Sequence, residues 1–253
     1  MRISTSSSEG GIRSAKISLS LASTPEEVRE VQRLRYKVFT EAIVLSSLAN
    51  PDGLAQDEMD AFCEHLIVRN TRTLKVVGSY RVLTPRAAAR CGRLQAEHMF
   101  DLDRLEHLRS KIVEAGRACI HPDYRGSGVL PMLWAGLFAL MKREGCDYLA
   151  GCASISLADG GYNATALYQG LGAQHLAPLE YRVEPRNPFV LHKCEPGHVP
   201  FMPPLLEGYL RSGAWVCGEP AWDADCNSAD LFLLLPVDAM HRRRHAQEAA
   251  GGI

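Results

Sequence analysis

The sequence predicts a single α+β domain in which helices flank a central mixed β-sheet. Apolar runs of strand length alternate along the chain with stretches of helical periodicity. Apolar residues make up 46% and charged residues 23% of the 253 residues, as in ordinary globular domains. The chain shows no internal repeat and no linker long enough to separate domains. We therefore expect a loose arm over residues 1–14, the domain over 15–240 and a basic tail over 241–253.

The domain is expected to begin with an edge strand over residues 16–23, where polar and apolar residues alternate. A helix should follow this strand. Thr24 can cap the helix, Pro25 suits its first turn, and Glu27 completes a capping box. Apolar residues at helical spacing extend the helix to about Phe39.

Apolar runs and turn signals place the remaining elements. In chain order they predict a mobile loop over 43–56, a hairpin of strands 65–69 and 75–83, a helix over 101–108, a strand over 111–120, a helix over 130–144, a strand over 147–154, a helix over 163–169, a strand over 177–183, a helix over 203–210, and strands over 215–217 and 231–236. The longest apolar run, residues 129–141, is too short to span a bilayer.

Charge and cysteine pattern argue against several functional classes. The formal net charge is −1, so no global basic field indicates binding to nucleic acid. The eight cysteines include no C-x-x-C pair and the nine histidines no H-E-x-x-H, so we expect free thiols and no metal site. The N-terminus lacks the apolar core of a signal peptide, which favours a cytoplasmic location.

A short glycine-containing turn precedes the apolar helix over 130–144. It consists of Arg125, Gly126, Ser127, Gly128 and Val129. Backbone N–H groups at the start of a helix have no partner within the helix, and the helix dipole favours negative charge there. Glycine lets an anion approach the backbone closely, and the arginine adds a charged fork. The turn therefore predicts a phosphate-binding site, although many such turns serve only to connect two elements.

Charged residues embedded in apolar elements give a second signal. They are Arg35 near the end of the first helix, Asp57 and Asp60 in DEMD, Arg81 on the second hairpin strand, and Glu114 and Arg117 within IVEAGRACI. Because burial of unpaired charges is costly, we expect these residues to pair with one another. A purely structural ion-pair network would explain them, but several lie on strands that lead to the turn, which favours a functional site.

Glu114 and Arg117 are three residues apart, so on a regular strand they would face opposite sides of the sheet. A bulge near residues 115–116 would bring both side chains to one face. Cys119 and Cys152 lie on apolar strands near the same site, where buried cysteine usually acts as a small apolar residue. A nucleophilic role for either thiol is the alternative.

Three patterns carry a resemblance to known acyltransferases. Arg125-x-x-Gly128-x-Leu130 resembles the pyrophosphate loop of the GNAT superfamily, with Leu130 in place of the usual glycine or alanine. The spacing R-x-x-x-F, D-x-x-D and E-x-x-R resembles the charged pattern of acyl-homoserine-lactone synthases. From about residue 28 to 237, segments such as QRLRYKVF, GRACIHPDYRGSGV and PPLLEGYLRSGAWVCGEPAWDADCNSADLFLLLPV resemble L-ornithine Nα-acyltransferases.

The resemblance implies a GNAT-like fold and an enzyme of ornithine lipid synthesis. Such an enzyme moves a 3-hydroxyacyl group from acyl carrier protein to the α-amine of L-ornithine and makes lyso-ornithine lipid. The co-substrate would be the phosphopantetheine thioester of the carrier protein, or acyl-CoA, with no tightly bound cofactor. Acyl carrier protein, L-ornithine and the inner membrane surface would be the partners, the last through a peripheral contact.

The resemblance also implies residue roles. Glu114 would be the general base, directly or through a water, and backbone N–H groups of residues 117–120 would polarise the thioester. The turn over residues 125–129 would hold the phosphopantetheine phosphate. One of Arg35, Arg81 or Arg117 would bind the ornithine carboxylate, and Asp57 or Asp60 its side-chain ammonium.

Two alternatives remain open from the sequence. One is an N-acyl amino acid synthase or acyl-homoserine-lactone synthase that uses a different acceptor. The other is a GNAT-fold binding module whose catalytic site has decayed, which Leu130 alone favours. The run Arg242–Arg244 is either a solvated end or a contact for acidic lipid or carrier protein.

Overall fold

A computed structural model describes residues 3–4, 16–42, 52–193 and 200–238. The chain divides into two compact units. The first unit comprises Met1–Gly92 and Ala115–Glu144, and the second comprises Arg93–Glu114 and Gly145–Ile253. Strand β6 (Ile112–Ile120) therefore gives its first three residues to the second unit and the rest to the first. The single domain expected over 15–240 stays a prediction.

The first unit is built on one part of the sheet, in which the first four strands pair antiparallel. Its strands follow the order β1-β2-β3-β4-β6. The first four are β1 (Ile3–Ser4), β2 (Ile17–Leu21), β3 (Glu64–Asn70) and β4 (Val76–Leu83). Strands β3 and β4 form the predicted hairpin. The predicted strand β2 exists, but β1, from the segment expected to be a loose arm, pairs with part of its outer edge. Of the loop predicted over 43–56, residues 43–51 lie outside the described residues.

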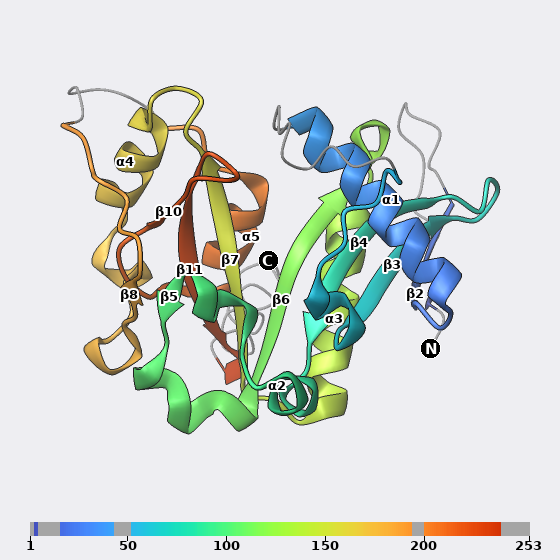
Figure 1. Cartoon of the computed structure of the whole chain (residues 1–253), viewed down its shortest axis with the longest axis horizontal. Helices are drawn as coiled ribbons and strands as arrows, with labels where there is room; N and C mark the ends of the chain where they lie inside the picture. The colour runs from blue at the N-terminus through green and yellow to red at the C-terminus, as the bar shows by residue number, and fades with distance from the viewer. Residues whose placement is uncertain (1–2, 5–15, 43–51, 194–199, 239–253) are drawn as a thin grey trace, which may run out of the picture. The chain divides into compact units, whose positions relative to one another are not determined.

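Two helices cover opposite faces of this sheet: α1 (Pro25–Ala42) lies in front of β3 and β4 in Figure 1, and α3 (Val129–Glu144) lies behind them. Gly136 allows close packing of α3, because a Cβ at this position would lie 2.7 Å from the Leu19 side chain. On the opposite face, Leu34 and Val38 of α1 pack against Cys119 of β6.

The start of α1 agrees with its sequence signal. The Thr24 Oγ1 accepts a hydrogen bond from the Glu27 N–H at 3.2 Å. The Glu27 carboxylate in turn accepts from the N–H and hydroxyl of Ser23, one residue earlier than a standard capping box places this bond. Shorter elements of the first unit are η2 (Glu58–Ala61), α2 (Pro85–Cys91) and η5 (Pro122–Tyr124).

The second unit contains a long antiparallel pair, β7 (Tyr148–Ser156) and β11 (Ser228–Pro236), which pair over nine positions. Figure 1 shows these strands together with β10 (Ala221–Asp223). The order is β6-β7-β11-β10, and β9 (Trp215–Val216) also pairs with β11. A separate pair joins β5 (Phe100–Asp101) to β8 (Glu184–Pro185). The helices are α4 (Tyr162–Gln169), α5 (Pro204–Ser212), and the 3₁₀ segments η3 (Gln95–His98), η4 (Asp103–Lys111), η6 (Ala173–His175) and η7 (Leu179–Tyr181).

Two predicted elements of the second unit differ from the structure. The strand predicted over 177–183 is wrong. Its end residues Ala177 and Val183 donate hydrogen bonds to the segment of β9, but Pro178, which has no N–H, starts the 3₁₀ turn η7 between them. The helix predicted over 101–108 exists as the 3₁₀ helix η4, which begins two residues later and runs to Lys111.

Within the described ranges, no helix has the length and apolar character needed to cross a membrane. Among those same residues no group of three His, Cys, Asp or Glu side chains is arranged to hold a metal ion. The seven cysteines that the structure describes are free thiols.

Candidate active site

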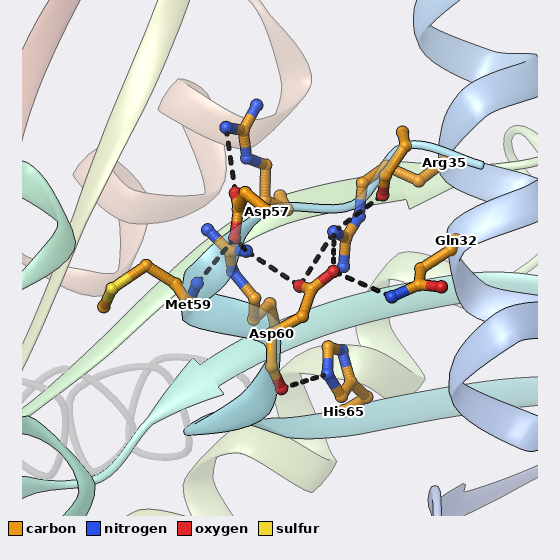
Figure 2. Close-up of polar contacts among 9 residues, drawn as sticks. Gln32, Arg35, Asp57, Met59, Asp60 and His65 are labelled. Atoms are coloured by element: carbon orange, nitrogen blue, oxygen red, sulfur yellow. Dashed lines mark hydrogen bonds and ion pairs between the residues drawn. The ribbon is translucent and has the colours of Figure 1, made fainter. Parts of the chain in front are cut away.

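A buried cluster of charged side chains lies in the first unit, on the face of the sheet that α1 covers (Figure 2). We call it the arginine cluster. It comprises Gln32 and Arg35 of α1, Asp57 and Asp60 at η2, His65 of β3, Arg81 of β4 and Arg117 of β6. The structure thus brings together all the predicted charged residues except Glu114, from four separate elements.

Asp60 is the centre of the arginine cluster. Its carboxylate accepts hydrogen bonds from Arg35 at 3.0 Å, from Arg81 at 2.8 Å and from the Gln32 amide at 3.0 Å. Figure 2 shows the carboxylate directed towards Arg35 and Gln32, while the Asp60 carbonyl faces His65. Burial alone would raise the pKa of Asp60, but the adjacent guanidinium groups outweigh burial and lower this pKa to about 2. Asp60 is therefore ionised at neutral pH.

Asp57 forms the more accessible edge of the cluster. Its Oδ1 accepts from the Met59 N–H at 3.0 Å, which caps η2, and also from Arg81 at 2.5 Å. Its Oδ2 pairs with Arg117 at 3.3 Å. About a third of each side chain in this last pair is exposed, 31% for Asp57 and 35% for Arg117. Burial opposes ionisation of Asp57, but the hydrogen bond and charge of Arg81 keep its pKa below the ordinary value.

The cluster carries excess positive charge. Three guanidinium groups face two carboxylates, and burial lowers the pKa of His65, so this imidazole is neutral at pH 7. The Nε and Nη2 of Arg35 and the Nε of Arg117 are buried donors with no acceptor among the described residues. Both carboxylates are already paired with arginines. The arrangement therefore favours an anion, and the role of Asp57 or Asp60 as the ligand of an ammonium stays a prediction.

Strand β6 is irregular between its two predicted functional residues. Arg117 adopts φ +54°, in the left-handed region that non-glycine residues rarely occupy. The cost is of order 1–2 kcal/mol, and such strain is concentrated at functional sites. The irregularity lies one residue beyond the predicted bulge at 115–116. It separates Arg117, which belongs to the first unit, from Glu114, which belongs to the second.

Glu114 is 4% exposed and is held by the start of η3. Its carboxylate accepts hydrogen bonds from the Gln95 N–H at 2.5 Å and from the Ala96 N–H at 2.8 Å. A carboxylate at the first N–H groups of a helical segment is stabilised as an anion by them. The arrangement fixes the orientation of the Glu114 side chain, which general-base catalysis requires, and at the same time anchors η3.

The predicted phosphate turn is open at its backbone. Gly126 and Gly128 have φ +76° and +84°, and a Cβ on either would meet no atom within 4 Å. The first backbone hydrogen bond of α3 runs from the Met132 N–H to the Gly128 carbonyl, and Pro131 has no N–H to donate. No described residue accepts from the backbone N–H of four residues, namely Gly126, Gly128, Val129 and Leu130. These N–H groups, together with the exposed Arg125, are those that an anion at the turn would meet.

The two cysteines near the predicted site are poor nucleophiles. Burial raises the pKa of Cys119 to about 12. Burial also raises the pKa of Cys152 well above its ordinary value, and the charges of Asp230 and Glu114 add to this effect. Both thiols are therefore protonated at neutral pH, whereas only a thiolate attacks a thioester efficiently.

Three polar residues with structural importance were not predicted. Gln32 and His65 join the arginine cluster, but nothing in their sequence surroundings sets them apart. Asp230 is 6% exposed on β11. The predicted strand began at Leu231, whereas β11 begins at Ser228 and includes Asp230. The same criterion of a charge embedded in an apolar run would have found it.

Comparison with known proteins agrees with this architecture. A family model for an acetyltransferase (GNAT) domain matches residues 34–135. The chain is 32% identical over 251 residues to the L-ornithine N(alpha)-acyltransferase of Rhodobacter capsulatus, covering 91% of this chain and 95% of that protein. It is 26% identical to the protein of the same name from Brucella abortus, over 91% and 88% of the two chains.

Solved structures share the fold at low sequence identity. TofI, in a complex with an inhibitor and MTA, has a TM-score of 0.51 and 12% identity over 88% of this chain and 96% of its own. FeeM, an N-acyl amino acid synthase from uncultured soil microbes, has a TM-score of 0.50 and 10% identity over 90% and 94%. The fold is the predicted GNAT-like one.

Proposed function

Because the chain belongs to the L-ornithine N(alpha)-acyltransferase family, we propose that it transfers an acyl group from a thioester donor to the α-amine of L-ornithine. The nitrogen–carbon bond of an amide forms, the carbon–sulfur bond breaks, and the thiol of the donor leaves with a proton. The donor is a 3-hydroxyacyl group on the phosphopantetheine of acyl carrier protein, with acyl-CoA as the alternative. The product is lyso-ornithine lipid.

The observation that carries the donor side of this proposal is the open turn before α3. Four backbone N–H groups there have no acceptor among the described residues, and Arg125 stands beside them. Phosphopantetheine and CoA both present a phosphate, which such N–H groups bind well. The positive φ of Gly126 and Gly128 and the empty space above them leave room for the phosphate at the backbone.

Glu114 is the proposed base for the α-amine, directly or through a water. An ammonium cannot attack a thioester, so its proton must be removed first. The two N–H groups of η3 hold the carboxylate of Glu114 in one orientation. Backbone N–H groups of residues 117–120 are the proposed donors to the oxyanion that forms on the thioester carbonyl. Cys119 and Cys152 are protonated thiols, which supports direct attack by the amine without an acyl-enzyme on either residue.

The arginine cluster is the proposed site for the carboxylate of the acceptor. Of its three arginines, Arg117 is the accessible one, while Arg35 and Arg81 are 1% exposed and pair with Asp60. Arg117 is therefore the proposed direct contact to the carboxylate. Arg35 and Arg81 are positioning residues that fix Asp60 and Asp57, and Asp57 in turn orients Arg117.

The product has an acyl chain and a charged head, so we infer that it is released at the inner membrane surface from the cytoplasmic side. The basic residues Arg242–Arg244, which lie outside the described range, are the proposed peripheral contact with acidic lipid.

Incubation of the purified chain with 3-hydroxyacyl carrier protein and a panel of amino acids tests the proposal. Release of free thiol is measured, and mass spectrometry identifies the product. We expect thiol release with L-ornithine and a product with the mass of an N-acylated ornithine. A parallel assay with 3-hydroxyacyl-CoA separates the two donors. Thiol release with another amine and not with ornithine, or formation of a lactone, would show a different synthase. No release with any acceptor would leave only a binding module.

A further inference from the structure

The tip of the β3–β4 hairpin, residues 70–75, presents an exposed apolar side chain in a strained conformation. Leu74 is 65% exposed and adopts φ +59°, in the left-handed region that glycine favours at turns. Hydrogen bonds hold this conformation, because the Leu74 N–H donates to the Asn70 carbonyl at 2.8 Å and the Arg69 guanidinium donates to the Leu74 carbonyl. Both strain and exposure oppose leucine at this position, so its presence requires an explanation beyond folding.

Cationic side chains surround Leu74 at the hairpin tip. Arg72 and Lys75 are exposed, and neither forms an ion pair with a described residue. Lys16 is exposed too and adjoins the tip, because its carbonyl accepts a hydrogen bond from the Thr71 N–H at 2.9 Å. The tip itself contains no acidic residue. It therefore carries a local positive charge, although the whole chain has a formal net charge of −1.

The hairpin tip is a neighbour of the turn over residues 125–129, which is proposed to bind the donor phosphate and which we call the donor turn. The Asn70 side-chain amide donates to the Tyr124 hydroxyl at 2.8 Å, so the tip holds the residue directly before the donor turn. The His121 N–H also donates to the Val77 carbonyl at 2.9 Å, at the start of β4. Both segments belong to the first unit.

The chemistry of the proposed donor brings a protein surface to this place. Phosphopantetheine is joined to its carrier protein by a phosphodiester on a serine side chain. A phosphate held at the donor turn therefore keeps the surface of the carrier protein within a few bonds of that turn. The segments that flank the donor turn must then meet the carrier protein, and the hairpin tip is one of them. Acyl-CoA places no protein there.

The charge around the donor turn suits an acidic partner. Arg125 is exposed and forms no ion pair with a described residue. The Lys37 ammonium of α1 lies 2.9 Å from the His121 Nε2, just before the turn. The carboxylate of this segment, Asp123, lies 3.7 Å from the Nδ1 of the same imidazole. Cations therefore outnumber carboxylates here, and opposite charges on two surfaces speed their encounter and fix their orientation.

We propose that Arg72, Leu74 and Lys75 form a docking surface for an acidic face of acyl carrier protein beside the donor turn. The leucine supplies an apolar contact that the carrier protein covers, and the two cations steer and orient the carrier. The inference rests on the proposed function and identifies the surface that receives the partner of its donor site. It also gives the chain a means to distinguish the carrier protein from acyl-CoA, which meets the donor turn alone.

The test compares the same 3-hydroxyacyl group on the carrier protein and on CoA. Arg72→Glu combined with Lys75→Glu reverses the charge of the tip and leaves the residues of the donor turn unchanged. We expect the KM for acyl carrier protein to rise roughly tenfold at low salt, while the KM for acyl-CoA stays within about twofold of wild type. The rise should shrink as the ionic strength increases.

Arg86→Glu combined with Arg90→Glu is the matched control. Both residues are exposed on α2, which follows β4, whereas the hairpin tip precedes it; Figure 1 shows α2 at the far end of that strand. This variant makes the same change of charge in the same unit and should leave both KM values unchanged.

Leu74→Gly separates docking from folding. Glycine adopts φ +59° without strain, so the urea midpoint of unfolding should not fall. The loss of the apolar contact should still raise the KM for acyl carrier protein roughly threefold or more.

Binding of holo carrier protein to the chain without an acceptor, followed by fluorescence anisotropy, gives a reading that does not depend on turnover. Unchanged binding in both tip variants, or equal losses in the tip and α2 charge variants, would overturn the inference. It would also be wrong if the tip variants bound the carrier normally and lost binding only to vesicles that contain phosphatidylglycerol. Normal carrier binding without acylation of ornithine from either donor would instead refute the proposed function.

Discussion

Arg81 and Asp60 form an ion pair that is closed to solvent. The Arg81 Nη1 lies 2.8 Å from the Asp60 Oδ1, with 1% and 6% of the two side chains exposed. The same carboxylate holds Arg35 at 3.0 Å, so one buried anion contacts two buried cations. Asp60 therefore stabilises the first unit by joining α1, which carries Arg35, to β4, which carries Arg81.

Replacement of Asp60 by asparagine should destabilise the protein by about 3–5 kcal/mol, because it leaves Arg35 and Arg81 without their common counter-charge. Urea unfolding, followed by circular dichroism, measures the loss. Glu64→Gln is the matched control: it breaks the pair with Arg143 in the same unit, whose side chain is 47% exposed, and should cost at most about 1 kcal/mol. Equal losses in the two variants would contradict the central role of Asp60.

The stability of the wild type should fall as the pH drops from about 4 towards 2. Burial would raise the pKa of Asp60, but Arg35 and Arg81 lower it from 3.8 to about 2 in the folded protein. A lowered pKa gives stability that is fully present above the unfolded value and is lost as pH falls through the folded value. The gap in unfolding free energy between wild type and Asp60→Asn should narrow by about 2 kcal/mol over this window. A constant gap in urea titrations at each pH would refute the assignment.

Gly128→Ala should raise the KM for the acyl donor roughly tenfold, because a side chain at φ +84° strains the turn that presents the backbone N–H groups. Gly92→Ala is the matched control. Gly92 has φ +81° and equally empty surroundings, but it lies at the end of α2 and not in the donor turn. Both variants should lose about 1 kcal/mol of stability, and only Gly128→Ala should affect the donor. Equal KM values would remove the turn from the donor site.

Glu114→Gln should lower kcat at least about 100-fold if Glu114 is the base. Its position on the N–H groups of Gln95 and Ala96 gives it a second duty, the support of η3. Glu97→Gln separates these duties, because Glu97 supports η3 through the Leu94 N–H and Arg109. We expect a small loss of kcat in that variant. Similar losses in both would mean that Glu114 only positions η3.

Alanine at Cys119 or Cys152 should leave turnover within about threefold of wild type, because burial keeps both thiols protonated and the amine attacks the thioester directly. Steady-state assays of the two variants measure this. An acylated cysteine, trapped by acid quench and found by mass spectrometry, would establish the covalent route instead.

Local signals were sufficient to predict much of the fold. Thr24 and Glu27 marked the start of α1, and the polar turn between residues 70 and 73 marked the β3–β4 hairpin. These features depend on neighbours in sequence. The segment over 177–183 was predicted wrongly because its apolar residues suit a strand, and only its contacts with β9 show that Pro178 opens a turn there.

The ion pairs within the site could not be predicted from the sequence. That Asp60 would pair with Arg35 and Arg81 depends on three segments that meet only in the fold. The assignment of an ammonium to Asp57 or Asp60 followed from charge alone and stays a prediction; in the structure, arginines already pair with both carboxylates. Asp230 escaped notice because the boundary of a single strand was placed three residues too late.

The division of β6 between the two units has an implication for the evolution of this protein. The turn proposed to bind the donor belongs to the first unit and the proposed base Glu114 to the second, and β6 carries the strained residue Arg117 near its middle. Substitutions around Glu114 can alter the surroundings of the acceptor amine while the donor turn keeps its packing. Diverged copies of this gene should therefore differ first in the amino acid that they acylate and only later in the thioester that they accept.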